Sequence, residues 1–77
     1  MRLKYIITEA NGFAMFSPES THANVARGME GKPVSAGFCI IDFEENKVRC
    51  YGESVTLKLK SRDEDSDIIT KKIKDAY

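Results

Sequence analysis

The chain has 77 residues and lacks tryptophan, long apolar runs and an excess of either charge. Its 12 Lys and Arg side chains equal its 12 Asp and Glu side chains, so the formal net charge is zero. Non-specific nucleic-acid binding draws its affinity from basic side chains that neutralise phosphates, so nucleic acid is not an expected partner. Because no apolar stretch reaches the length of a signal peptide or a membrane span, we expect a cytoplasmic protein.

Histidine and cysteine are also scarce, which limits metal and catalytic chemistry. The chain has one histidine, His22, and two cysteines, Cys39 and Cys50, with no Cys-x-x-Cys pair. A structural zinc site takes four ligands, so these three residues predict no metal centre. No nucleophile elbow or glycine-rich phosphate loop accompanies them. We therefore expect neither an enzyme nor a protein that depends on a cofactor.

The composition that is present belongs to one small folded domain. Hydrophobic residues make up 42% of the chain and charged residues 31%, which is typical of a globular protein and argues against disorder. The length fits a single domain, residues 1–77. A chain this short has a thin core, so we expect it to gain stability by association, as a homodimer.

Three segments near the two ends of the chain predict strands. Residues 2–8 and 13–16 flank Asn11-Gly12, a dipeptide that favours a type I′ hairpin turn. Residues 55–60 alternate apolar and polar side chains, which predicts an edge strand. The side chains that this strand turns outward are Lys58 and Lys60, and outward lysines protect an edge from unwanted pairing.

Residues 34–43 and 47–51 predict a second hairpin that contains both cysteines. With a turn centred on Glu45-Asn46, opposite charges and apolar side chains face each other in the pairs Asp42–Arg49, Ile40–Tyr51, Phe43–Val48 and Ile41–Cys50. The two cysteines are then diagonal, about 7–8 Å apart, whereas a disulfide needs Cβ atoms about 3.5–4.5 Å apart. We therefore predict two buried thiols that pack as small apolar side chains.

Two further segments have helical periodicity. The first is predicted to begin with Ser17 as N-cap and Pro18 at the first helical position, and to end at Gly31. Its apolar stripe consists of His22, Val25, Ala26 and Met29. The second is predicted to begin at a capping box formed by Ser61 and Glu64. Its stripe consists of Ile68, Ile69, Ile73 and Ala76, and its acidic start and basic end suit the helix macrodipole as a solvated face.

These elements predict an α+β fold, with an antiparallel sheet of four to five strands in two hairpins, one helix between the hairpins and one C-terminal helix. Phe38, Ile40 and Tyr51 fall on the sheet face opposite the cysteines, so the sheet is apolar on both faces. We expect the two helices to leave part of this second face uncovered. An uncovered apolar face marks a surface for a partner or for self-association.

The segments 33–38 (PVSAGF), 50–54 (CYGES) and 57–62 (LKLKSR), followed by Asp65, resemble a family of small proteins encoded by bacteriophages and prophages. The likeness covers most of the chain. In the family pattern a glycine often stands where Lys58 is, and a proline where Asp63 is. The glycine's absence here predicts a regular strand at that point.

The resemblance implies a setting and not an activity: a phage-derived protein in a bacterial cytoplasm that engages a host or phage macromolecule. The polar positions that match the family pattern are His22, Ser54, Ser61, Arg62 and Asp65.

We therefore expect a non-enzymatic protein-interaction module that uses the face of Phe38, Ile40 and Tyr51 or the strand that carries the two lysines. The alternative is a small-ligand or metal-binding protein centred on His22 and the two cysteines. That alternative requires the three side chains to converge in space, which the sequence does not decide.

Overall fold

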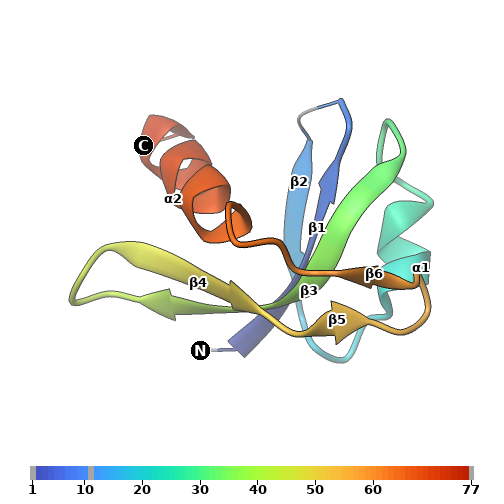
Figure 1. The fold of residues 1–77 in the computed structure, drawn as a ribbon, viewed down its shortest axis with the longest axis horizontal. Coiled ribbons are helices and arrows are strands. Elements are labelled where there is room, and N and C mark those ends of the chain that lie inside the picture. Colours follow the sequence, from blue (N-terminus) through green and yellow to red (C-terminus); the bar gives the residue numbers. More distant parts are fainter. Residues whose placement is uncertain (1, 11, 77) are drawn as a thin grey trace.

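The computed structural model describes residues 2–10 and 12–76, apart from the side chain of Ala76. The elements of this part of the chain, in order, are β1 (Arg2–Thr8), β2 (Phe13–Phe16), α1 (His22–Ala26), β3 (Pro33–Asp42), β4 (Lys47–Tyr51), β5 (Glu53–Ser54), β6 (Leu59–Lys60) and α2 (Asp65–Ala76). The α+β fold predicted from the sequence is confirmed (Figure 1).

The main sheet is antiparallel, with strand order β2-β1-β3-β4. The first hairpin is present, with Tyr5 opposite Met15, but its register differs from the predicted one. A two-residue turn at Asn11-Gly12 would pair residue 10 with Phe13, whereas Phe13 pairs with Ile7; Asn11 itself lies outside the described residues. β1 is an inner strand of the sheet, and its consecutive residues Tyr5, Ile6 and Ile7 are buried. Burial of consecutive residues means that both faces of β1 are covered at this point, because successive side chains of a strand point to opposite faces.

The helices α2 and α1 lie at opposite ends of the molecule (Figure 1). Ile69 of α2 packs with Tyr5, Ile7, Cys39 and Val48, so we call this side of the sheet the helix face. On the opposite side, α1 covers one end of the sheet through His22. The rest of that side carries Phe38, Ile40 and Tyr51 and is called the aromatic face.

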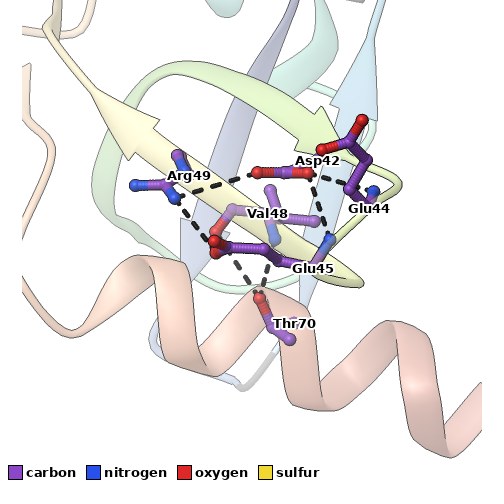
Figure 2. Close-up of polar contacts among 6 residues, drawn as sticks. All are labelled: Asp42, Glu44, Glu45, Val48, Arg49 and Thr70. Atoms are coloured by element: carbon purple, nitrogen blue, oxygen red, sulfur yellow. Dashed lines mark hydrogen bonds and ion pairs between the residues drawn. The ribbon is translucent and has the colours of Figure 1, made fainter.

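Two hydroxyl groups of α2 also accept hydrogen bonds from the backbone along the outer edge of β4. The backbone N–H of Val48 donates to Thr70 Oγ1 at 2.9 Å (Figure 2), and that of Cys50 donates to Ser66 Oγ at 2.8 Å. An edge strand otherwise presents unpaired N–H groups that invite pairing with another chain. At these two residues β4 is therefore protected by its own C-terminal helix.

The predicted register of the second hairpin is wrong by two residues. The observed partners are Ile40 with Arg49, Ile41 with Val48, Cys39 with Cys50 and Phe38 with Tyr51. A two-residue shift leaves every side chain on its predicted face, because the side-chain period of a strand is two. The cysteines are consequently directly opposite each other and not diagonal.

The turn between β3 and β4 explains the shift. Asp42 Oδ1 accepts the backbone N–H groups of Glu44 at 3.1 Å and Glu45 at 3.2 Å, which stabilises a four-residue turn over 43–46 (Figure 2). Asn46 completes it with a φ of 54°, a conformation that asparagine tolerates. Arg49 is no longer opposite Asp42 but still pairs with it at 3.8 Å, and it also pairs with Glu45 at 3.1 Å.

The first helix is shorter than predicted, and its N-cap is Thr21 in place of Ser17. Thr21 Oγ1 accepts the backbone N–H of Asn24 at 3.2 Å. Ser17 instead begins a turn, in which its carbonyl accepts the N–H of Ser20 at 3.0 Å and its hydroxyl that of Glu19 at 3.2 Å. The hydroxyls of serine and threonine bond to nearby backbone groups in turns as well as at N-caps, and here Ser17 stabilises a turn while Thr21 caps the helix.

The predicted strand over 55–60 is also wrong, because these residues form a turn and the short strand β6. Lys58 has a φ of 56°, in the left-handed region that glycine adopts without strain. Ser54 Oγ accepts the N–H of Leu57 at 3.3 Å and holds the turn. The lysine therefore occupies a bend, and the resulting β5–β6 hairpin packs against β3.

We expect the substitution Gly37→Ala to destabilise the protein by about 1–3 kcal/mol, since overpacking forces backbone shifts. A Cβ at this position would lie 2.6 Å from the carbonyl oxygen of Tyr51. Gly28→Ala is the matched control, because its Cβ would come no closer than 3.7 Å to the Val25 carbonyl oxygen. Urea unfolding of both variants checks this, and equal midpoints would contradict the close approach.

We expect Lys58→Gly to stabilise the protein by about 0.5–1 kcal/mol. The left-handed conformation costs a non-glycine residue about 1–2 kcal/mol, which exceeds the entropy cost of glycine. Lys60→Gly in β6 is the control and should lose about 0.5–1 kcal/mol. If thermal unfolding shows a loss for both variants, Lys58 is not in the left-handed turn.

Candidate functional site

The aromatic face is centred on two stacked rings from neighbouring strands. Phe38 of β3 is paired with Tyr51 of β4, and their rings lie 5.8 Å apart between centroids at an angle of 26°. Ile40 and Tyr51 are each 39% exposed, which is high for large apolar side chains in a sheet. Ile40 and Tyr51 thus leave apolar surface exposed on this face, whereas Phe38 between them is half-buried.

Basic side chains from β1 lie beside these rings. The register of β1 on β3 sets Lys4 opposite Phe38 and Arg2 opposite Ile40. The Arg2 guanidinium lies over the Phe38 ring, 4.3 Å from its centroid, in a cation–π contact. Neither residue was predicted to lie at this face. The available signal was their spacing of two in a predicted strand, but only the pairing of β1 with β3 brings them to the aromatic face.

A hollow of about 490 Å³ opens at the end of this face, between α1 and the β5–β6 hairpin. The two elements lie at the same end of the molecule in Figure 1. The side chains that line the hollow include Arg2, Lys4, His22, Phe38, Tyr51 and Glu53. Apolar rings with two cations and one carboxylate at the rim suit an apolar group that carries negative charge.

His22 forms part of the wall of this hollow and is fixed by the backbone. Its Nε2 lies 2.9 Å from the carbonyl oxygen of Gly37, which can only accept, so Nε2–H donates. Its ring makes edge contacts with Phe16 at 5.5 Å and Phe38 at 6.2 Å. Burial lowers the pKa of His22, opposed by the hydrogen bond to Gly37. The imidazole is therefore neutral at pH 7 and supports the aromatic face.

The two cysteines lie on the helix face, so the sheet separates them from His22. Burial raises the pKa of the Cys39 thiol to about 11 and that of the Cys50 thiol to about 12. The three residues proposed for a shared ligand or metal site are thus not brought together. Over the described ranges, residues 2–10 and 12–76, no group of three or more His, Cys, Asp or Glu side chains is arranged to hold a metal ion.

Asp65 is fully buried, and its carboxylate accepts three hydrogen bonds. Its Oδ2 accepts the Tyr5 hydroxyl at 2.5 Å and the backbone N–H of Arg62 at 2.9 Å. Its Oδ1 accepts Arg62 Nε–H at 2.9 Å. The bond back to the Arg62 N–H has the form of a capping box, shifted by one residue from the predicted Ser61 and Glu64 pair.

The polar residues that match the phage family pattern divide into two groups. Ser54, Ser61, Arg62 and Asp65 shape the β5–β6 hairpin and the start of α2, where the Ser61 N–H also donates to the Gly52 carbonyl at 3.0 Å. Only His22 reaches the hollow. The exposed lysines of the hairpin, Lys58 and Lys60, do not line it.

No protein-family model, curated protein or solved structure matches the chain, so the resemblance to phage proteins stays a prediction. In the parts of the chain that the structure describes, no helix has the length and apolar character needed to span a membrane.

We expect Tyr5→Phe to reduce the loss of stability at alkaline pH. Burial, and then the bond to Asp65, raises the pKa of Tyr5 above its usual value of about 10. Above that pH the unfolded phenol loses its proton while the folded one keeps it, so stability falls as pH rises. The variant should lose about 1.4 kcal/mol less per pH unit there.

At neutral pH the same variant should cost about 1–2 kcal/mol, because one oxygen of Asp65 loses a donor. Urea unfolding between neutral and alkaline pH measures both effects. If the free energy of unfolding of the variant and of the wild type fell equally with rising pH, the pKa of Tyr5 would be the same in the folded and the unfolded protein.

Proposed function

We propose that the chain is a non-enzymatic protein-interaction module that binds its partner through the aromatic face. The observation that carries this proposal is the stacked pair of the half-buried Phe38 and the exposed Tyr51, with the guanidinium of Arg2 over the Phe38 ring. Aromatic rings and arginine are the side chains that most often dominate binding energy at protein interfaces. Ile40 extends the same surface.

The chemistry of the remaining residues supports binding without catalysis. A cysteine–histidine site needs the imidazole within hydrogen-bond reach of a thiol that ionises readily. Here the His22 Nε2 is occupied by the Gly37 carbonyl, and both thiols lie across the sheet with raised pKa values. The same separation leaves a ligand or metal site shared by His22 and the cysteines without support.

The charges around the face favour a protein over a nucleic acid. Arg49 also belongs to this face, but Asp42 and Glu45 already pair with it. The remaining charges around the hollow are the two cations Arg2 and Lys4 and the carboxylate of Glu53. This positive excess is small for a surface that binds a polyanion. In addition, Arg2 covers a face of the Phe38 ring on which a base would stack. The surface fits a protein segment with an apolar side chain and a neighbouring carboxylate.

The first partner to test is a second copy of the chain, in keeping with the homodimer expected from its size. The face carries cations and a carboxylate together, so it can complement itself across a two-fold axis. A host or phage protein in a bacterial cytoplasm is the partner that the phage resemblance implies. Both partners would use the same apolar centre, and both are therefore tested by one substitution.

We expect Tyr51→Glu to weaken association at least about 30-fold, the effect of about 2 kcal/mol at a central interface residue. Phe43→Glu is the control, because Phe43 is 74% exposed in the β3–β4 turn, away from the stacked rings. Native mass spectra over a range of protein concentrations measure the dimer. If the wild type is monomeric, capture of a bacterial partner by the wild type and the control, but not by Tyr51→Glu, measures the heterologous interaction.

Phe43→Glu should unfold at nearly the same urea concentration as the wild type, since its side chain is largely exposed. Tyr51→Glu loses the stacking on Phe38 and should cost about 0.5–1.5 kcal/mol, with the domain still folded. Equal association of all three proteins would contradict the use of the aromatic face. Binding of single-stranded DNA that weakens steeply with salt would replace the protein partner by a nucleic acid.

A further inference from the structure

We propose that Cys39 and Cys50 are a thiol pair that forms an intramolecular cross-strand disulfide when a low-molecular-weight disulfide oxidises the protein. Both thiols are free, and Cys39 is buried. The two residues are direct partners in the β3–β4 ladder, and the chain contains no other cysteine. This inference is independent of the proposed interaction surface, which lies on the other face of the sheet.

Directly opposite residues in an antiparallel ladder form either a hydrogen-bonded or a non-hydrogen-bonded pair, and the hydrogen bonds to α2 show which kind Cys39 and Cys50 form. In an antiparallel ladder each residue directs both its N–H and its C=O to the same side. The N–H groups of Val48 and Cys50 donate to Thr70 and Ser66, so they point away from β3. Cys39 and Cys50 therefore form a non-hydrogen-bonded pair, the closer of the two kinds.

The closer kind has the spacing that a disulfide requires. Its Cα atoms lie about 4.5 Å apart, inside the range of about 4.4–6.8 Å found in disulfides. Both side chains point to the helix face, because directly opposite residues share a face. Bond formation therefore needs side-chain rotation and little movement of the backbone.

The difference in exposure between the two thiols decides which of them reacts first with the small disulfide. Cys39 is fully buried, whereas Cys50 is partly exposed at the edge strand. Burial raises the pKa of both thiols, and the negative charge of Cys39 raises that of Cys50 further. Thiolates are therefore scarce at neutral pH, so exchange should be slow there and faster at alkaline pH.

The reaction is thiol–disulfide exchange with a small disulfide RSSR such as oxidised glutathione. The Cys50 thiolate attacks one sulfur of RSSR, forming a mixed disulfide and releasing RS⁻. The Cys39 thiolate then attacks Cys50 Sγ, forming the cross-strand bond and releasing a second RS⁻. Two protein thiols are oxidised, one RSSR is reduced, and the two protons leave with the two RSH molecules.

The test starts from the folded, fully reduced wild type, which is incubated with oxidised glutathione at mildly alkaline pH. Samples are quenched in acid, and free thiols are alkylated in denaturant before the intact mass is measured. We expect a monomer that is lighter by two hydrogen atoms and takes up no alkylating agent. Two alkylated thiols, a lasting adduct of one glutathione per chain, or disulfide-linked dimers would overturn the proposal.

A matched pair of cysteines tests the spacing itself. In the double variant Cys39→Ser, Ile41→Cys, the two thiols on this face are diagonal in the observed register, since Ile41 faces Val48. Diagonal positions are about 7–8 Å apart, so we expect the disulfide to form at least roughly tenfold more slowly than in the wild type. Equal or faster formation would show that position 41 faces Cys50, which would overturn the proposal.

Discussion

The buried carboxylate of Asp65 is the constraint on which the arrangement of the two layers depends. It is fully buried, and the Tyr5 hydroxyl and two N–H groups of Arg62 satisfy it. A buried carboxylate without such partners costs several kcal/mol, so the native state must bring all three donors to it. The bond from Tyr5 spans 60 positions and fixes the start of α2 to the inner strand β1.

Once the start of α2 is fixed, the helix can cover only one of the two sheet faces. The helix buries Ile69 against Tyr5 and Cys39, and its Ser66 and Thr70 hydroxyls complete the edge of β4. α2 is then committed to the helix face. On the other face, α1 and the β5–β6 hairpin border the hollow at one end, and Ile40 and Tyr51 stay exposed.

Hydrophobic alternation was sufficient to predict the fold class and the face of each residue in the second hairpin. It was insufficient for the register, because a shift of two residues keeps both faces, and the choice depends on Asp42 binding the N–H groups of the turn. Lys58 was misplaced for a similar reason: Ser54 holds a turn that alternation does not encode.

The candidate site was predictable in its apolar part and not in its polar part. Phe38, Ile40 and Tyr51 share a face by local spacing alone, whereas Arg2 joins them only through the pairing of β1 with β3. The sequence pattern alone places Asp65 among several solvated acids in a first helical turn, whereas its side chain is fully buried. Its burial depends on Tyr5, a partner so distant in sequence that no local pattern contains the information.

A double-mutant cycle with Tyr5→Phe and Asp65→Asn tests the central role of this contact most directly. Urea unfolding of the wild type, the two single variants and the double variant gives the coupling free energy of the pair. A coupling of about 1–3 kcal/mol is predicted for a buried hydrogen bond to a carboxylate. Additivity within about 0.5 kcal/mol would show that Tyr5 and Asp65 act separately, and that another interaction holds α2 on the sheet.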